Sequence, residues 1–252
     1  STISVPSDAT TSGIRGLTTA QFAAYSSDQL AGFQPTQVGL FTSAQIKSIL
    51  PTSLPGLSTD AIKGLSATQV AALTTAQIQA LSSSQFKTLE ADDLKAFSSA
   101  QINALTTAQI AQLSTVQLQA IDASDLKAMN TANIAALDSA QIQKLTAEQL
   151  TNLTSAQIGA FTAGEIGALT ASQVRMLTTA QTAGLDTTLI AGMETADIAV
   201  LSPTAFKGLS TASLAALSTA QAAALTAGQI NGLATAQLQK LEDADITALS
   251  TA

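Results

Sequence analysis

The sequence predicts an all-α fold: an α-solenoid of very short capped helices, with one helix per 8-residue repeat around a single continuous apolar spine. Three observations predict it. Large apolar residues recur at every eighth position from Leu17 to Leu249. A second apolar column runs at the same interval from Phe22 to Ile246, and signals for a helix start stand between the two columns. A repeat this short cannot bury its apolar face alone, so successive copies must stack on one another.

The two apolar columns hold one register throughout. With Leu17 as position 1 of an octad, position 1 is large and apolar in all 30 copies. Position 6 is Ile, Leu, Val or Phe in 27 of 29 copies; the exceptions, Thr182 and Ala222, are expected to be weak points. In one continuous helix this stripe would rotate by about 80° per octad, and in a strand positions 1 and 6 would face opposite sides. The chain must therefore bend within each octad.

Each octad carries its own helix start. Position 2 is mostly Ser, Thr, Asp or Asn, and position 5 is Gln in 18 copies, which together form a capping box. Pro35, Pro51 and Pro203 all stand at position 3, the first helical residue, where proline is tolerated. Residues 49–56 lack both the cap and the Gln and carry Pro55 at position 7, so we expect a local irregularity there.

Charges and small residues support separate helices. Apart from Asp8, all 16 acidic residues lie at positions 2 to 5, and all 10 basic residues lie at positions 7 or 8. Helix dipoles favour this arrangement if every octad is its own helix. Position 8 is mostly Ala or Gly, which indicates close backbone approach at the turn. The number of octads in one coil of the solenoid stays open between two and three.

The chain divides into a tail and an array. Residues 1–8 predict an extended N-terminal tail, and residues 9–252 form the repeat solenoid, with 29 complete in-register octads from Leu17 and a partial last one. The last octads are ordinary copies, without the polar outer face that a terminal repeat normally has, so an open end is expected. The residues predicted to form a self-assembly interface are Ile3, Val5, Ile14 and Leu17 at one end and Leu241, Ile246 and Leu249 at the other.

Composition excludes several classes of function. The chain has no Cys, His or Trp and one Tyr, so it lacks the usual thiolate and imidazole groups of enzymes and metal sites. We predict no enzyme activity, no cofactor and no metal. The net charge of -7 argues against nucleic acid as a partner. No stretch approaches the roughly 18 apolar residues of a membrane span, so no membrane insertion is expected.

The acidic octads are candidate sites. Residues 90–93, 122–125, 194–197 and 242–245 carry paired carboxylates, but they lack the loop spacing of a calcium site. We interpret these acids as substitutes in the capping box; calcium binding, a glycosidase-like acid pair and ice binding by the Ser/Thr faces are weaker alternatives. The Gln column is interpreted as capping and hydrogen bonding between coils.

The run LTTAQIQALSSSQF, which begins at Leu73, resembles the "LTTAQIAAL" octad arrays of very large exported bacterial surface proteins, often labelled adhesin-like. The resemblance covers nearly the whole chain and implies a stalk, filament or sheath at an extracellular or bacterial cell-surface location. We therefore expect a structural protein that assembles head to tail with copies of itself into an extracellular filament or sheath. The alternative is a stalk or binding segment of an adhesin, which would expose apolar surface along one side.

Overall fold

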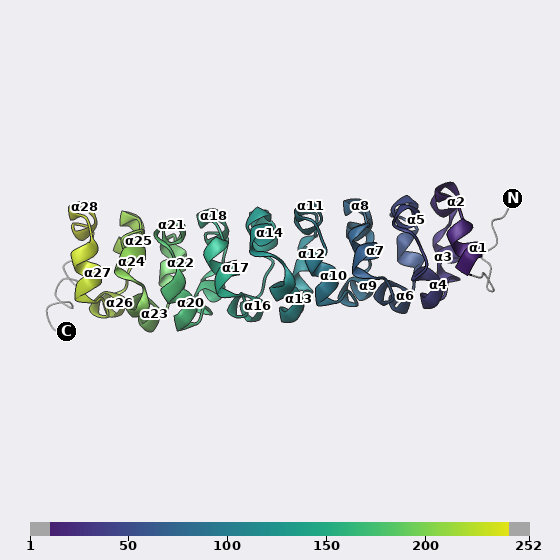
Figure 1. The fold of residues 1–252 in the computed structure, drawn as a ribbon. Helices are drawn as coiled ribbons and strands as arrows, with labels where there is room; N and C mark the ends of the chain where they lie inside the picture. Colours follow the sequence, from purple (N-terminus) through teal and green to yellow (C-terminus); the bar gives the residue numbers. More distant parts are fainter. Residues whose placement is uncertain (1–10, 242–252) are drawn as a thin grey trace. The chain divides into compact units, whose positions relative to one another are not determined.

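The computed structural model describes residues 11–241, and within that range the chain folds into 28 α-helices and one 3-10 helix (η1), with no strand. None of these described helices is longer than six residues. The chain divides into two compact units, Ser1–Asp125 and Leu126–Ala252. Figure 1 labels the short helices of each unit and colours them by sequence. Each unit is a solenoid of very short helices, which confirms the predicted fold class.

The first unit begins the array. Its elements are α1 (Thr11–Gly16), α2 (Thr19–Ala24), α3 (Ser27–Ala31), α4 (Pro35–Val38), α5 (Ser43–Ser48), η1 (Leu54–Gly56), α6 (Thr59–Lys63), α7 (Ala67–Ala71), α8 (Thr75–Ala80), α9 (Ser83–Lys87), α10 (Ala91–Lys95), α11 (Ser99–Asn103), α12 (Thr107–Ala111) and α13 (Thr115–Ala120). Helix α14 (Ala123–Ala128) contains the boundary between the units.

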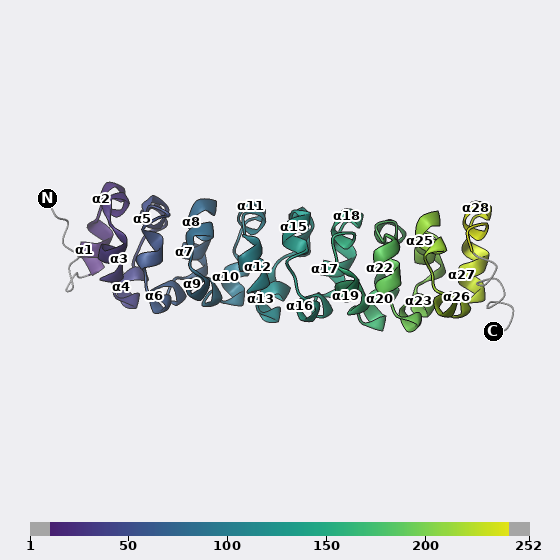
Figure 2. The ribbon, with the colours of Figure 1, turned by 180° about the vertical axis from the view of Figure 1, so that it is seen from behind.

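The second unit repeats the same plan, as the view from behind shows (Figure 2). Its elements are α15 (Thr131–Ile134), α16 (Ser139–Gln143), α17 (Ala147–Asn152), α18 (Ser155–Ile158), α19 (Ala163–Gly167), α20 (Ala171–Met176), α21 (Thr179–Thr182), α22 (Thr187–Gly192), α23 (Thr195–Val200), α24 (Pro203–Phe206), α25 (Thr211–Ala215), α26 (Thr219–Ala223), α27 (Ala227–Gly232) and α28 (Thr235–Leu238).

The helices start and end where the sequence predicts, as α8 illustrates. The backbone N–H of Gln77 donates to Thr74 Oγ1 at 3.2 Å, and the backbone N–H of Thr74 donates to Gln77 Oε1 at 2.8 Å, which completes a capping box. Leu81 then takes an extended conformation, and its N–H donates to the carbonyl oxygen of Ile78 at 3.2 Å. A position-1 residue thus ends one helix and leads into the cap of the next.

One coil of the solenoid contains three octads. The most extensive helix contacts join elements three octads apart, such as α2 with α5 and α10 with α13 in the first unit, and α19 with α22 and α24 with α27 in the second. This settles the number that the sequence left open. Within each unit, positions 1 and 6 point inward and form the core; Ile78 and Leu81, for example, are buried.

The irregular copies keep their place in the core. Residues 49–56 contain the short 3-10 helix η1 (Leu54–Gly56) instead of an α-helix, which is the expected irregularity, and Leu54 stays buried. Ala222 is fully buried. Thr182 is fully buried as well, and its Oγ1 donates to the carbonyl oxygen of Ala205 at 2.6 Å. The hydroxyl of Thr182 therefore joins two coils at a position where other copies place an apolar side chain.

Glycine at the turns allows coils to approach backbone to backbone. No residue in the described range has a positive φ, so these glycines do not serve as left-handed helix caps. A Cβ added at Gly192 would lie 2.6 Å from the carbonyl oxygen of Ala163 in the preceding coil. A Cβ at Gly184, also at position 8, would clash with the carbonyl oxygen of Ser155 in the preceding coil. The small residues predicted from position 8 are needed between coils rather than within the turn.

Candidate functional site: the stacking surface

The position-5 glutamine uses both ends of its side-chain amide. In α8, Gln77 Oε1 accepts the cap N–H of Thr74, while its Nε2 donates to the carbonyl oxygens of Ile46 at 2.7 Å and Ile49 at 2.6 Å. Those carbonyls belong to the preceding coil, 31 and 28 residues earlier. Gln77 is only 1% exposed, so this contact between coils lies in the interior. One side chain therefore starts its own helix and attaches that helix to the coil before it.

The same contact recurs in both units, and we call this set of residues the glutamine ladder. Each member donates from Nε2 to one or more carbonyl oxygens 28 to 31 residues earlier. In the first unit the members are Gln45, Gln69, Gln77, Gln85, Gln101, Gln109 and Gln117. In the second unit they are Gln157, Gln173, Gln181, Gln221, Gln229 and Gln237.

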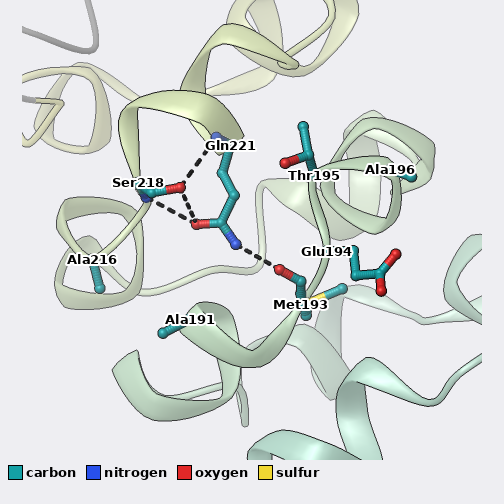
Figure 3. Close-up of a pocket in the computed structure, with 8 residues that line it drawn as sticks. All are labelled: Ala191, Met193, Glu194, Thr195, Ala196, Ala216, Ser218 and Gln221. Atoms are coloured by element: carbon teal, nitrogen blue, oxygen red, sulfur yellow. Dashed lines mark hydrogen bonds between the residues drawn. The ribbon is translucent and has the colours of Figure 1, made fainter.

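The ladder gives each coil a donor side and an acceptor side. Figure 3 shows one contact: Gln221 Nε2 donates to the carbonyl oxygen of Met193 at 2.8 Å, and Gln221 Oε1 accepts the N–H of Ser218 at 2.8 Å. In every member the side-chain amide points back along the chain and a backbone carbonyl receives it. The interface between coils is therefore heterologous, with one face complementary to the other. The sequence predicted hydrogen bonding between coils, but the acceptors are backbone groups that no pattern of side chains reveals.

Several octads replace the ladder glutamine. Ser213 still donates to the preceding coil, from Oγ to the carbonyl oxygen of Leu185 at 2.6 Å. Glu165 keeps the capping bond, in which its Oε2 accepts the N–H of Thr162 at 2.7 Å. An ionised carboxylate has no hydrogen to donate, so Glu165 preserves the helix start and loses the contact between coils.

Three aspartates stand at position 5 and are buried: Asp93, Asp125 and Asp197. Asp125 accepts the hydroxyl of Ser99 from the preceding coil. Asp93 is 5% exposed and Asp197 is 7% exposed, and each accepts the N–H of its cap residue, at 2.8 Å and 3.0 Å respectively. Burial raises the pKa of the Asp93 carboxyl above its ordinary value of 3.8. The N–H of Glu90 lowers the pKa, and the charges of Glu90 and Asp92 raise it. Burial likewise raises the pKa of Asp197. The acidic octads at 90–93 and 194–197 therefore act in capping, as interpreted from the sequence.

The predicted interface residues lie in different settings. Ile14 and Leu241 are buried, Leu17 is half-buried, and the backbone carbonyls of Ile14 and Leu17 accept the Nε2 of Gln45 at 3.0 Å and 2.8 Å. The remaining predicted residues lie outside the described range: Ile3, Val5, Ile246 and Leu249.

Leu238 is an exposed apolar residue that was not among the predicted interface residues. It stands at position 6 of the last described octad and is 38% exposed, whereas every position-6 residue from Leu126 to Ala222 is fully buried. Its place in the position-6 column was the signal that could have identified it.

The surface of the described residues has open depressions between turns. One, with a volume of about 590 Å³, is lined by Met193, Glu194, Ser218 and Gln221 among others (Figure 3). Its polar side-chain groups are the hydroxyls of Thr195 and Ser218, the amide of Gln221 and the carboxylate of Glu194, which points away from the amide. Among residues 11–241, no three His, Cys, Asp or Glu side chains come together in a group that could hold a metal ion. None of the described helices is long and apolar enough to cross a membrane.

Comparison with known proteins finds one family. The ALTTAQ repeat matches residues 54–83, 86–120, 118–155 and 190–227, which together make up more than half of the chain. No curated protein matches the sequence. The matched segments lie in both units and include α7, α8 and α10 to α13, whose short capped helices carry most of the ladder in the first unit.

Proposed function

The chain belongs to the ALTTAQ repeat family, and from that premise we propose that it is a structural protein that assembles head to tail with copies of itself into an extracellular filament or sheath. The glutamine ladder is the observation that carries the proposal. Coils joined by the ladder present backbone carbonyls to the following coil and side-chain amides to the preceding one, so the two faces of a coil are of opposite kind and complementary. A heterologous interface of this type generates open filaments when its rotation does not close a ring.

Apolar contact supplies the second part of the argument. Leu238 is 38% exposed, and within the solenoid a residue at this position is covered by the following coil. A coil from a second copy, stacked in the same register, would cover Leu238 in the same way. Because the apolar core and the ladder would both continue across the junction, contact between copies would reuse the interactions that hold the chain itself together.

The test measures assembly of the full chain by sedimentation velocity and negative-stain electron microscopy over a series of concentrations. We compare the native chain with Leu238→Asp, which places a charge on the exposed position-6 site. Val116→Asp is the matched control, because Val116 is 63% exposed at position 4, outside the two core columns. Circular dichroism checks that both variants remain helical.

We expect concentration-dependent filaments from the native chain and from Val116→Asp, and an at least tenfold higher threshold concentration for Leu238→Asp. Native chains that stay monomeric at every concentration would refute the proposal. Equal assembly of the two variants would refute the assignment of the interface to the coil face that carries Leu238. Monomers that bind a ligand along the flank would favour the stalk or binding segment of an adhesin.

A further inference from the structure

We propose that Asp93 and Asp197 make coil stacking sensitive to acid, so that each coil junction they occupy is weak when the carboxylate is charged and strong when it is protonated. This goes beyond assembly, because it concerns junctions within one chain. The basis is positional: both residues replace glutamine in the ladder, where neighbouring octads place a neutral amide that donates to the preceding coil.

The local geometry places a charge where the fold is built for a neutral donor. Each aspartate is at least nine-tenths buried, and each accepts the N–H of its own cap residue. Counting back 31 and 28 residues from Asp93, as at Gln77, leads to the backbone carbonyls of Ile62 and Leu65 in the preceding coil. An ionised carboxylate has no hydrogen to donate to either carbonyl, and burying a charge that accepts a single backbone N–H is costly.

Within the described part of the chain, the helix of the preceding coil that contains Ile62 is α6, and its two charged residues, Asp60 and Lys63, are both exposed. Helix α10 packs against α7 and α13, and the sequences of both helices contain no titratable residue. On its own element, Glu90 and Asp92 are anionic and oppose the charge of Asp93, and Lys95 is exposed on the last turn. Protonation is therefore the available way to relieve the buried charge.

The surroundings of Asp197 are similar. Helix α23 packs against α20 and α26; α26 has no titratable residue, and the one in α20, Arg175, is exposed. Ile166, 31 residues before Asp197, lies in α19, whose one titratable residue, Glu165, is half-buried. Glu194 on the same element opposes ionisation. The N–H of Glu194 favours the charged form, but burial is the larger effect and sets the direction.

The sign of the pH dependence follows from the raised pKa of the two carboxyls. Burial raises the pKa of both carboxyls in the folded chain above the ordinary value of 3.8. Stability from proton uptake is therefore fully present below about pH 4 and is lost as the pH rises through the folded-state pKa. Acid should strengthen these two junctions.

The test compares urea unfolding midpoints from pH 3.5 to pH 7.5, at dilutions where sedimentation shows a monomer, so that the result is independent of filament assembly. The test variant combines Asp93→Asn with Asp197→Asn, a change that Asn133 shows to be compatible with position 5. The control combines Asp28→Asn with Asp60→Asn, which removes the same charge from exposed first-turn sites.

We expect the test variant to unfold at higher urea than the native chain at pH 7.5, and the difference to shrink toward zero at pH 3.5. The control should show the opposite sign at pH 7.5, because charged first-turn acids stabilise helices. Carbon NMR titration of the two carboxyls gives a direct readout, with midpoints above 3.8 expected. Carboxyl titration midpoints at or below 3.8 would overturn the proposal. A change in the urea unfolding midpoint equal to that of the control variant would overturn it as well.

Discussion

Replacing Gln77 by Glu separates the two roles of a ladder residue. The carboxylate retains an oxygen for the cap N–H of Thr74, as the native Glu165 does for Thr162. It loses two donated hydrogen bonds, of 2.7 Å and 2.6 Å, to the carbonyls of the preceding coil. At about 1 kcal/mol net for each bond, and more because buried acceptors stay unpaired, we expect a loss of about 2–4 kcal/mol.

The loss is measured by urea unfolding at neutral pH, together with hydrogen exchange of the amides in α5 and α8. Because a repeat array need not unfold as one unit, the exchange data locate the effect. Gln143→Glu makes the same chemical change on an exposed side chain and should shift the free energy of unfolding by less than about 0.5 kcal/mol. If Gln77→Glu were as stable as Gln143→Glu, the ladder would not hold the coils together.

Two further substitutions test packing between coils. In Gly192→Ala the new Cβ would lie 2.6 Å from the carbonyl oxygen of Ala163, so thermal unfolding should show a free energy of unfolding lower by about 1–3 kcal/mol. The control Gly164→Ala should be neutral or stabilising, because the nearest atom to its new Cβ is 3.9 Å away. A lower unfolding temperature for the Gly164 variant than for the Gly192 variant would contradict the backbone contact. Thr182→Val keeps the shape of the side chain but removes the donor to Ala205, and calorimetry should show a loss of about 1 kcal/mol or more; an unchanged midpoint would show that this hydrogen bond contributes nothing.

The local structure could be predicted from short-range patterns. The cap at Thr74 and the helix stop at Leu81 depend on residues within one octad, so spacing alone located them. The irregularity at η1 was also predictable, because the cap and the Gln are both missing there. The sequence placed the close backbone approach of position 8 at the turn between helices, whereas the contact of Gly192 with Ala163 shows that the approach is between coils.

The sequence by itself determined the helices, their limits and their buried faces, because each of these depends on residues a few positions apart. Tertiary structure alone decided that three octads form one coil and that Gln77 reaches the carbonyls of Ile46 and Ile49. The backbone carbonyls that accept these hydrogen bonds leave no pattern in the amino-acid sequence. The number of octads in one coil depends on how closely the stacked helices pack. The stacking surface, from which the proposed function follows, therefore exists only in the folded chain.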